Sequence, residues 1–146
     1  SVWTTDKDGI IMCLLAAEIK AVTGLSPLAY YEKVCKQLGQ ATYTKRCDTA
    51  VSKEEKIRIA ALDKSDIGVD KLGNATITDI ETRSAYENLP IGGIKISTAD
   101  GWIAARPSGT EDLYKLYSES YRSDEEAESL LQDGKVLIDE ALRDKK

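Results

Sequence analysis

Histidine and phenylalanine are missing from the 146 residues, and cysteine and proline occur only three times each. Without histidine, the chain lacks the commonest general base and the commonest transition-metal ligand. Without phenylalanine, aliphatic side chains have to fill most of the interior, beside seven tyrosines. The absence of histidine therefore excludes many ordinary enzyme sites.

Thiol pairing and membrane-directed segments are also lacking. Cys13, Cys35 and Cys47 are odd in number and have no close paired spacing, so we predict reduced thiols in a cytoplasmic protein. The apolar run 10–17 is far shorter than the roughly 20 residues of a membrane span. No basic leader of a signal peptide precedes it. The sequence therefore predicts a soluble protein with no membrane partner.

The composition is that of an ordinary globular protein, with 42% hydrophobic and 31% charged residues. Its length allows one domain, or one domain and a short piece of a neighbour. A net charge of -5 argues against a nucleic-acid partner, because such binding usually needs a concentrated basic face. A small anion could still bind locally.

The first 39 residues read as a separate helical piece. Residues 8–23 are apolar almost all round and end at Gly24, and residues 27–38 form a second helix capped by Ser26. We expect a helix that is apolar on every side to be surrounded by other parts of a protein.

Residues 40–146 carry strand and helix signals that predict an α+β domain. We expect an antiparallel sheet of four strands with helices on one face. Gly134 should weaken the last helix by about 1 kcal/mol relative to alanine. The segments read as strands 41–49 and 75–82, a hairpin over 92–106, a strand over 113–119, helices 52–62 and 123–143, and turns over 63–73.

The segment Arg106–Glu111 lies between two expected strands and concentrates groups suited to phosphate. An arginine fork and the hydroxyls of Ser108 and Thr110 can donate to phosphate oxygens. Gly109 would let the backbone amides curl around an anion, and Lys115 could add a second positive charge. The alternative is an ordinary Pro-Ser-Gly turn beside a surface arginine.

The sequence Arg-Pro-Ser-Gly-Thr-Glu at 106–111 resembles the phosphate-binding loop of the α-D-phosphohexomutase superfamily. The flanking segments 101–105 and 114–117 look like the bacterial phosphoglucomutase branch. The opening segment 1–10 is similar to the end of the third domain's ligand region in these enzymes. The resemblance divides the chain into a remnant of domain three, 1–39, and a phosphate-binding domain four, 40–146, with a fold like the TATA-box-binding protein.

The resemblance implies an enzyme of four domains that interconverts glucose 1-phosphate and glucose 6-phosphate. A phosphoserine in domain one transfers the phosphoryl group through a glucose 1,6-bisphosphate intermediate, and carboxylates in domain two bind Mg²⁺. Domain four grips the phosphate that is not reacting. The implied partners are therefore a sugar phosphate and domains one to three of the same enzyme.

The resemblance also assigns residues. It places Arg106, Ser108, Gly109, Thr110 and Lys115 against phosphate. No catalytic or metal-binding residue is assigned.

Lys7 resembles a basic residue of domain three near the sugar phosphate, or it is a solvated turn lysine. Asp112 departs from the proline or asparagine of many relatives, which puts the geometry at the end of the loop in question.

The phosphoserine motif, the aspartate-rich metal loop and the Gly-Glu-Glu-Ser sugar loop do not occur in this sequence. We therefore expect the chain alone to have no mutase activity. We also expect its helical piece, lacking a covering sheet, to self-associate as a homo-oligomer. Three alternatives stay open, which are a phosphomannomutase-type relative, a non-catalytic module that binds phosphorylated metabolites, and a nucleic-acid binder.

Overall fold

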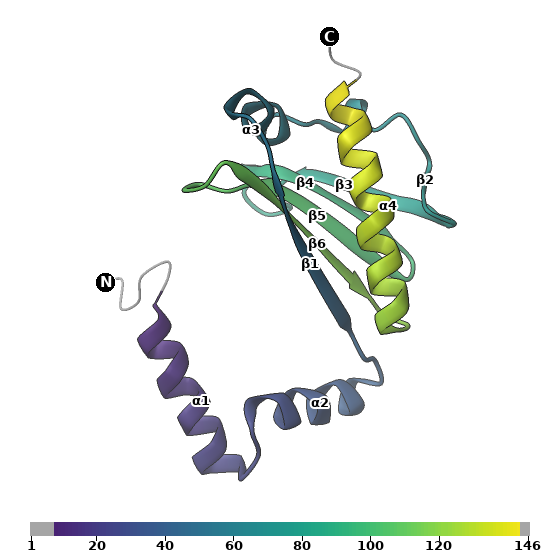
Figure 1. Cartoon of the computed structure of the whole chain (residues 1–146). Helices are drawn as coiled ribbons and strands as arrows, with labels where there is room; N and C mark the ends of the chain where they lie inside the picture. Colours follow the sequence, from purple (N-terminus) through teal and green to yellow (C-terminus); the bar gives the residue numbers. More distant parts are fainter. Residues whose placement is uncertain (1–7, 144–146) are drawn as a thin grey trace. The chain divides into compact units, whose positions relative to one another are not determined.

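The computed structural model describes residues 8–143 and divides the chain into two compact units, residues 1–41 and 42–146. We call them the helical unit and the sheet unit. The helical unit contains α1 (Gly9–Thr23) and α2 (Pro27–Leu38) (Figure 1). The predicted capping groups are in place, because Ser26 Oγ accepts from the amide of Ala29 at 3.2 Å and Gly24 adopts a left-handed conformation.

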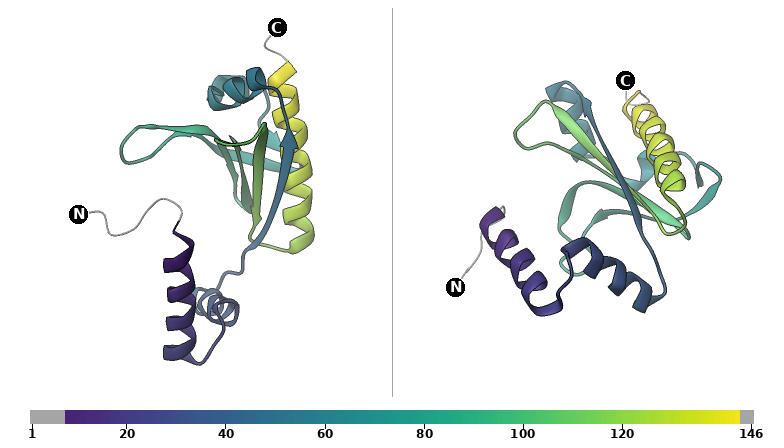
Figure 2. Two further views of the ribbon diagram at one scale, coloured as in Figure 1. Left: turned by 60° about the vertical axis from the view of Figure 1, so that its left-hand side comes forward. Right: turned by 60° about the horizontal axis from the view of Figure 1, so that its bottom comes forward.

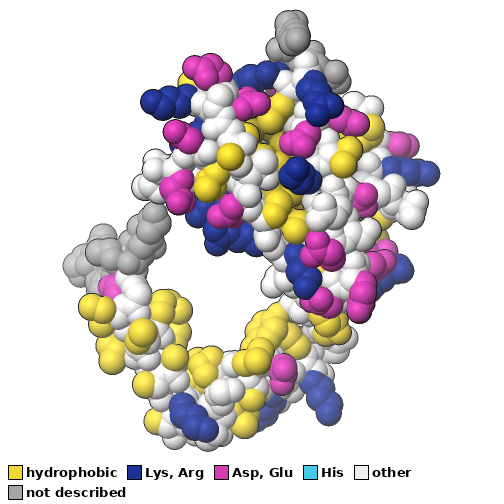
Figure 3. All heavy atoms as spheres, in the orientation of Figure 1, with side chains coloured by type: hydrophobic (Ala, Val, Ile, Leu, Met, Phe, Trp, Pro, Cys, Tyr) yellow, Lys and Arg dark blue, Asp and Glu magenta, His cyan; other side chains and the backbone are white. Residues whose placement is uncertain are grey.

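Neither helix of the helical unit buries a single residue. Hydrophobic side chains gather on the surface over α1 and α2 (Figure 3). Within residues 8–143, no single helix is long and apolar enough to span a membrane, and α1 with α2 meets that requirement only as a pair bent by 67°. The exposed large hydrophobic residues of the two helices are Ile10, Met12, Leu14, Leu15, Val22, Leu28, Tyr31 and Leu38.

The sheet unit is built on an antiparallel sheet of six strands in the order β1-β6-β5-β4-β3-β2. Consecutive strands from β2 to β6 are neighbours, and β1 lies at the edge beside β6. The strands are β1 (Tyr43–Ala50), β2 (Lys71–Leu72), β3 (Ala75–Arg83), β4 (Pro90–Thr98), β5 (Gly101–Pro107) and β6 (Leu113–Ser120).

The α+β class is confirmed, but the prediction of four strands is wrong. The hairpin expected over 92–106 contributes two full strands, β4 and β5. The remaining strand, β2, is only two residues long and lies in the stretch 63–73, for which the sequence predicts turns. Two residues are too few for an alternating pattern, so no periodicity could reveal this strand.

Two helices pack against one face of this sheet, α3 (Lys53–Ala60) and α4 (Asp124–Arg143) (Figures 1 and 2). A short 3₁₀ helix, η1 (Lys64–Asp66), follows α3. A capping box starts α3, since Glu55 accepts from the Ser52 amide at 2.7 Å while Ser52 Oγ accepts from the Glu55 amide at 3.2 Å.

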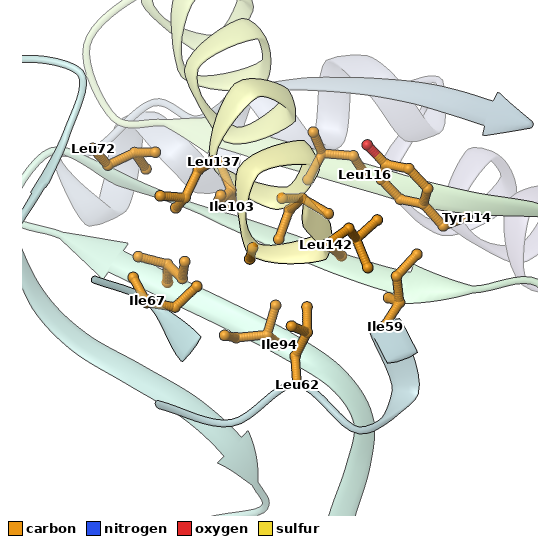
Figure 4. Close-up of a cluster of buried hydrophobic side chains, with 14 of the residues drawn as sticks. Ile59, Leu62, Ile67, Leu72, Ile94, Ile103, Tyr114, Leu116, Leu137 and Leu142 are labelled. Atoms are coloured by element: carbon orange, nitrogen blue, oxygen red, sulfur yellow. The ribbon is translucent and has the colours of Figure 1, made fainter. Parts of the chain in front are cut away.

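The hydrophobic core lies between the sheet and these helices (Figure 4). Ile59 of α3, Ile96 of β4 and Leu116 of β6 are fully buried there. Ser118 of β6 donates to the carbonyl of Ala127 in α4 at 2.7 Å, which fixes the helix against the same face. Strand residues that alternate with these ones therefore face away from the helices.

Gly134 has a packing role that the sequence did not indicate. It is buried in α4, and a Cβ at this position would lie 2.8 Å from Cδ1 and 3.1 Å from Cγ2 of Ile103 in β5. The missing side chain therefore lets α4 approach the sheet closely. The expected weakening of the helix is offset by this contact.

We expect Gly134→Ala to destabilise the chain by about 1 kcal/mol, because overpacking costs about 1–3 kcal/mol and exceeds the gain in helix propensity of about 1 kcal/mol. Ile103→Val removes Cδ1, the atom nearest to the new methyl group. In urea unfolding, the double variant should lose less stability than the sum of the two single changes. Simple additivity of the three measurements would contradict the contact.

Candidate phosphate-binding site

The candidate site lies where β5 runs into β6. Arg106 is in the last part of β5, and residues 108–112 connect the two strands; we call them the β5–β6 loop. The amide of Ser108 donates to the carbonyl of Leu113 at 2.9 Å, which closes the loop at its base. A strand pair thus holds both ends of the loop.

Ser108 organises the loop from inside. Only 7% of its surface is exposed, and its Oγ accepts from the amides of Thr110 at 3.5 Å and Glu111 at 3.3 Å. In this conformation those two amides face the serine oxygen. Within the described residues, the Ser108 hydroxyl proton and the Gly109 amide have no recorded acceptor, so both can donate to a ligand.

Gly109 does not use the freedom that the sequence argument gave it. Its φ is outside the left-handed region, unlike that of Gly24, Gly39, Gly73 and Gly92. A Cβ at Gly109 would meet nothing within 4 Å. The missing side chain therefore leaves open space beside the loop rather than permitting a special backbone conformation.

Arg106 and Lys115 are brought together on the sheet face that α3 and α4 leave uncovered. They are direct cross-strand partners in the β5–β6 register, and Asp48 of β1 is the next partner of Lys115. Their neighbours Ala105 and Tyr114 are buried on the opposite face. The register of two hairpin strands thus places both predicted cations beside the loop.

Arg106 is exposed, and within residues 8–143 its guanidinium has no recorded ion pair or hydrogen bond. Arg46 instead binds Asp48 through two nitrogens, at 2.6 and 2.8 Å. This hydrogen bond holds the pKa of Asp48 below its usual value, and the charge of Lys115 lowers the pKa of Asp48 further. The carboxylate therefore stays ionised beside Arg46, which it binds, and Lys115, its cross-strand partner.

Lys56 is a contact residue of the loop that sequence reasoning missed. From α3, its ammonium group donates to the Glu111 carbonyl at 2.6 Å and lies 3.6 Å from Oδ1 of Asp112. The amide of Val51 donates to the carbonyl of Asp112 at 3.1 Å. The end of the loop, at Glu111 and Asp112, is thus held by the segment 51–56.

Two further expectations concern Lys7 and metal binding. Lys7 lies outside the described residues, so its role stays a prediction. Within residues 8–143, no group of three or more His, Cys, Asp or Glu side chains is arranged to hold a metal ion. The Mg²⁺ that the resemblance implies for the whole enzyme stays a prediction.

Comparison with known proteins agrees with the fold. The family model "Phosphoglucomutase/phosphomannomutase, C-terminal domain" matches residues 50–134, more than half of the chain. A phosphoglucomutase of Komagataeibacter xylinus is 46% identical over 123 residues, covering 84% of this chain and 22% of that protein. A phosphoglucomutase/phosphomannomutase of Thermococcus kodakarensis is 35% identical over 69 residues, which are 47% of this chain and 15% of the relative.

These matches establish the family. The sheet unit is an α+β domain in which Arg106 of β5 and Lys115 of β6 flank the loop between the two strands. The chain belongs to the phosphoglucomutase/phosphomannomutase C-terminal domain family. The chain spans about a fifth of the length of the Komagataeibacter xylinus relative.

Proposed function

We propose that this chain is the C-terminal region of a phosphoglucomutase and that its sheet unit binds the phosphate of a sugar phosphate. The observation that carries the proposal is the Arg106 guanidinium, which is exposed, without a recorded ion pair in residues 8–143, and directly opposite Lys115. An arginine fork can donate two parallel hydrogen bonds to phosphate. The family membership supports the same assignment.

The proposed role of each residue in phosphate binding follows from its position in the site. Arg106 takes two phosphate oxygens, and Lys115 adds a point charge from the neighbouring strand. The Ser108 hydroxyl, the Thr110 hydroxyl and the Gly109 amide donate from the loop. Holding the phosphate that does not react orients the sugar and converts binding energy into correct placement of the reacting hydroxyl.

The phosphoryl transfer itself requires groups outside this set. We propose that domains one to three of the same enzyme supply the phosphoserine and the Mg²⁺ site, and that glucose 1,6-bisphosphate is the intermediate between glucose 1-phosphate and glucose 6-phosphate. The helical unit would belong to domain three. The 146-residue chain alone should then show no mutase turnover.

A phosphomannomutase-type activity is the second candidate. It is favoured by the name of one relative, the Thermococcus kodakarensis phosphoglucomutase/phosphomannomutase, and by the description of the matched family. The residues of the β5–β6 loop contact only phosphate in this proposal, so they do not separate glucose from mannose. A module that binds phosphorylated metabolites without turnover would use the same contacts.

Titration of the chain with glucose 1-phosphate, followed by NMR of backbone amides, tests the proposal. We expect shifts confined to the region 106–115 and weak affinity, of about 1 mM. Gly109→Ala should weaken binding about tenfold, because a methyl group would block one charge-assisted hydrogen bond from the loop.

Gly68→Ala is the matched control, since a Cβ at Gly68 also meets nothing within 4 Å and its φ is ordinary. Both variants should keep the wild-type melting temperature, and only Gly109→Ala should lose affinity. Shifts spread over the whole chain, or equal affinities of the two variants, would refute the loop as the phosphate site.

A further inference from the structure

A side chain of α3 binds the end of the β5–β6 loop. The Lys56 ammonium group donates to the carbonyl of Glu111, at 2.6 Å, although 55 residues separate the two. Its side chain is only 20% exposed. A charge-assisted hydrogen bond to a backbone carbonyl is stronger than a neutral one, and it fixes main chain rather than a side chain.

The helix that carries Lys56 is anchored in the sheet unit. Both ends of the capping box that starts α3 are formed, and Ile59, on the same helix, is fully buried in the core. The backbone at Lys56 is therefore tied to the folded sheet unit. The Val51 amide adds a second tie by donating to the carbonyl of Asp112 at 3.1 Å.

Lys56 approaches the loop from the helix side of the sheet, whereas Arg106 and Lys115 lie on the uncovered side. Figure 2 shows the loop beside α3 in its right-hand view. The ammonium group is also close to a carboxylate, 3.6 Å from Oδ1 of Asp112. This placement suits a residue that shapes the loop and not one that binds the anion.

We propose that Lys56 is a positioning residue that holds the β5–β6 loop in the conformation that binds phosphate. The proposal rests on the phosphate-binding function proposed above. If loss of Lys56 leaves the loop in that conformation for only a fraction of the time, the apparent affinity falls by the same fraction. Lys56 then raises the affinity for phosphate without contacting the phosphate.

The first arm of the test needs no ligand. In the phosphate-free chain, Lys56→Met should speed hydrogen exchange of the Thr110 and Glu111 amides, which face Ser108 Oγ, by about fivefold or more. Lys56→Arg keeps a donor for the Glu111 carbonyl and should exchange nearly as slowly as the wild type. Unchanged exchange in Lys56→Met would overturn the proposal.

Two control variants separate the hydrogen bond from the charge. Lys53→Met removes the same charge from the same helix, where Lys53 is exposed and has no recorded contact in the described residues. Asp112→Asn removes the 3.6 Å ion pair but leaves the hydrogen bond from Lys56 to Glu111. Neither change should alter exchange in the loop.

The second arm is titration with glucose 1-phosphate at two salt concentrations. Lys56→Met should bind about fivefold to tenfold more weakly than the wild type, with Lys56→Arg restoring most of the loss. The ratio of the two dissociation constants, Lys56→Met to wild type, should not change with salt. A direct ion contact would be screened by salt, whereas an effect of loop order would not. A ratio that collapses at high salt would make Lys56 a phosphate ligand and overturn the positioning role.

The two arms also separate this proposal from the proposed function. If the wild type does not bind glucose 1-phosphate, the proposed function fails, while the exchange measurement still judges whether Lys56 orders the loop. If binding is present and exchange rises without loss of affinity, only the positioning role fails. Lys56→Gln replaces Lys56→Met if the methionine variant melts below the temperature of the measurement.

Discussion

Arg106→Glu should lower kcat/KM for glucose 1-phosphate by about a thousandfold in a complete phosphoglucomutase that contains this chain. Two charge-assisted hydrogen bonds of about 2 kcal/mol each would be lost, and together they correspond to that factor. A carboxylate at the same place would also repel the phosphate. Steady-state kinetics with glucose 1-phosphate is the measurement.

Two further variants show whether the effect comes from the guanidinium fork. Arg106→Lys keeps the charge but loses the paired donors, so its kcat/KM should fall between that of the wild type and that of Arg106→Glu. Arg143→Glu makes the same change of charge at an exposed arginine of α4 that has no recorded ion pair in residues 8–143. A similar loss in Arg106→Glu and Arg143→Glu would contradict a specific phosphate contact.

The helices and long strands of this chain could be predicted because their signals are local. Ser26 before Pro27, and Ser52 three residues before Glu55, mark helix starts through bonds within one turn. The alternation over 92–106 predicted a hairpin because side chains on a strand point to opposite faces in turn. In each case the neighbours in sequence are also the neighbours in space.

Features that depend on packing between distant segments could not be predicted. Gly134 looked like a weakness of a helix, and only its distance to Ile103 of β5 reveals a close approach. The strand β2 exists because Lys71 and Leu72 pair with the start of β3, not because of a pattern of their own.

The same distinction between local signals and distant contacts applies to the candidate site. Arg106 and Lys115 were predicted as phosphate ligands from the loop motif, and the β5–β6 register places them opposite one another. Lys56 had no signal, because a lysine on an amphipathic helix is ordinary and its acceptor is a backbone carbonyl 55 residues away. A sequence pattern identifies donors that face a ligand more readily than residues that hold the loop behind them.

Gly93→Ala should destabilise the chain by about 3 kcal/mol and displace the backbone at Arg106. Gly93 is buried in β4, and a Cβ there would overlap the carbonyl oxygen of Ala105 and come within 3.1 Å of the Arg106 Cα. No rotation of a side chain can relieve a clash with main chain. Strand β5 must therefore move at the residue on which the proposed site depends, and affinity for glucose 1-phosphate should fall along with stability.

Gly92→Ala separates this clash from a general intolerance of the β4 start. Gly92 has a φ of 67° and open space around its Cα, so alanine there should cost only about 1 kcal/mol of backbone strain. Urea unfolding compares the stabilities of the two variants, and NMR shifts of the Arg106 amide report the displacement. Equal stabilities of the two variants would contradict a costly clash between residue 93 and β5. An unmoved Arg106 signal in Gly93→Ala would mean that β4 and not β5 moves, so that the close approach of Gly93 does not position the arginine.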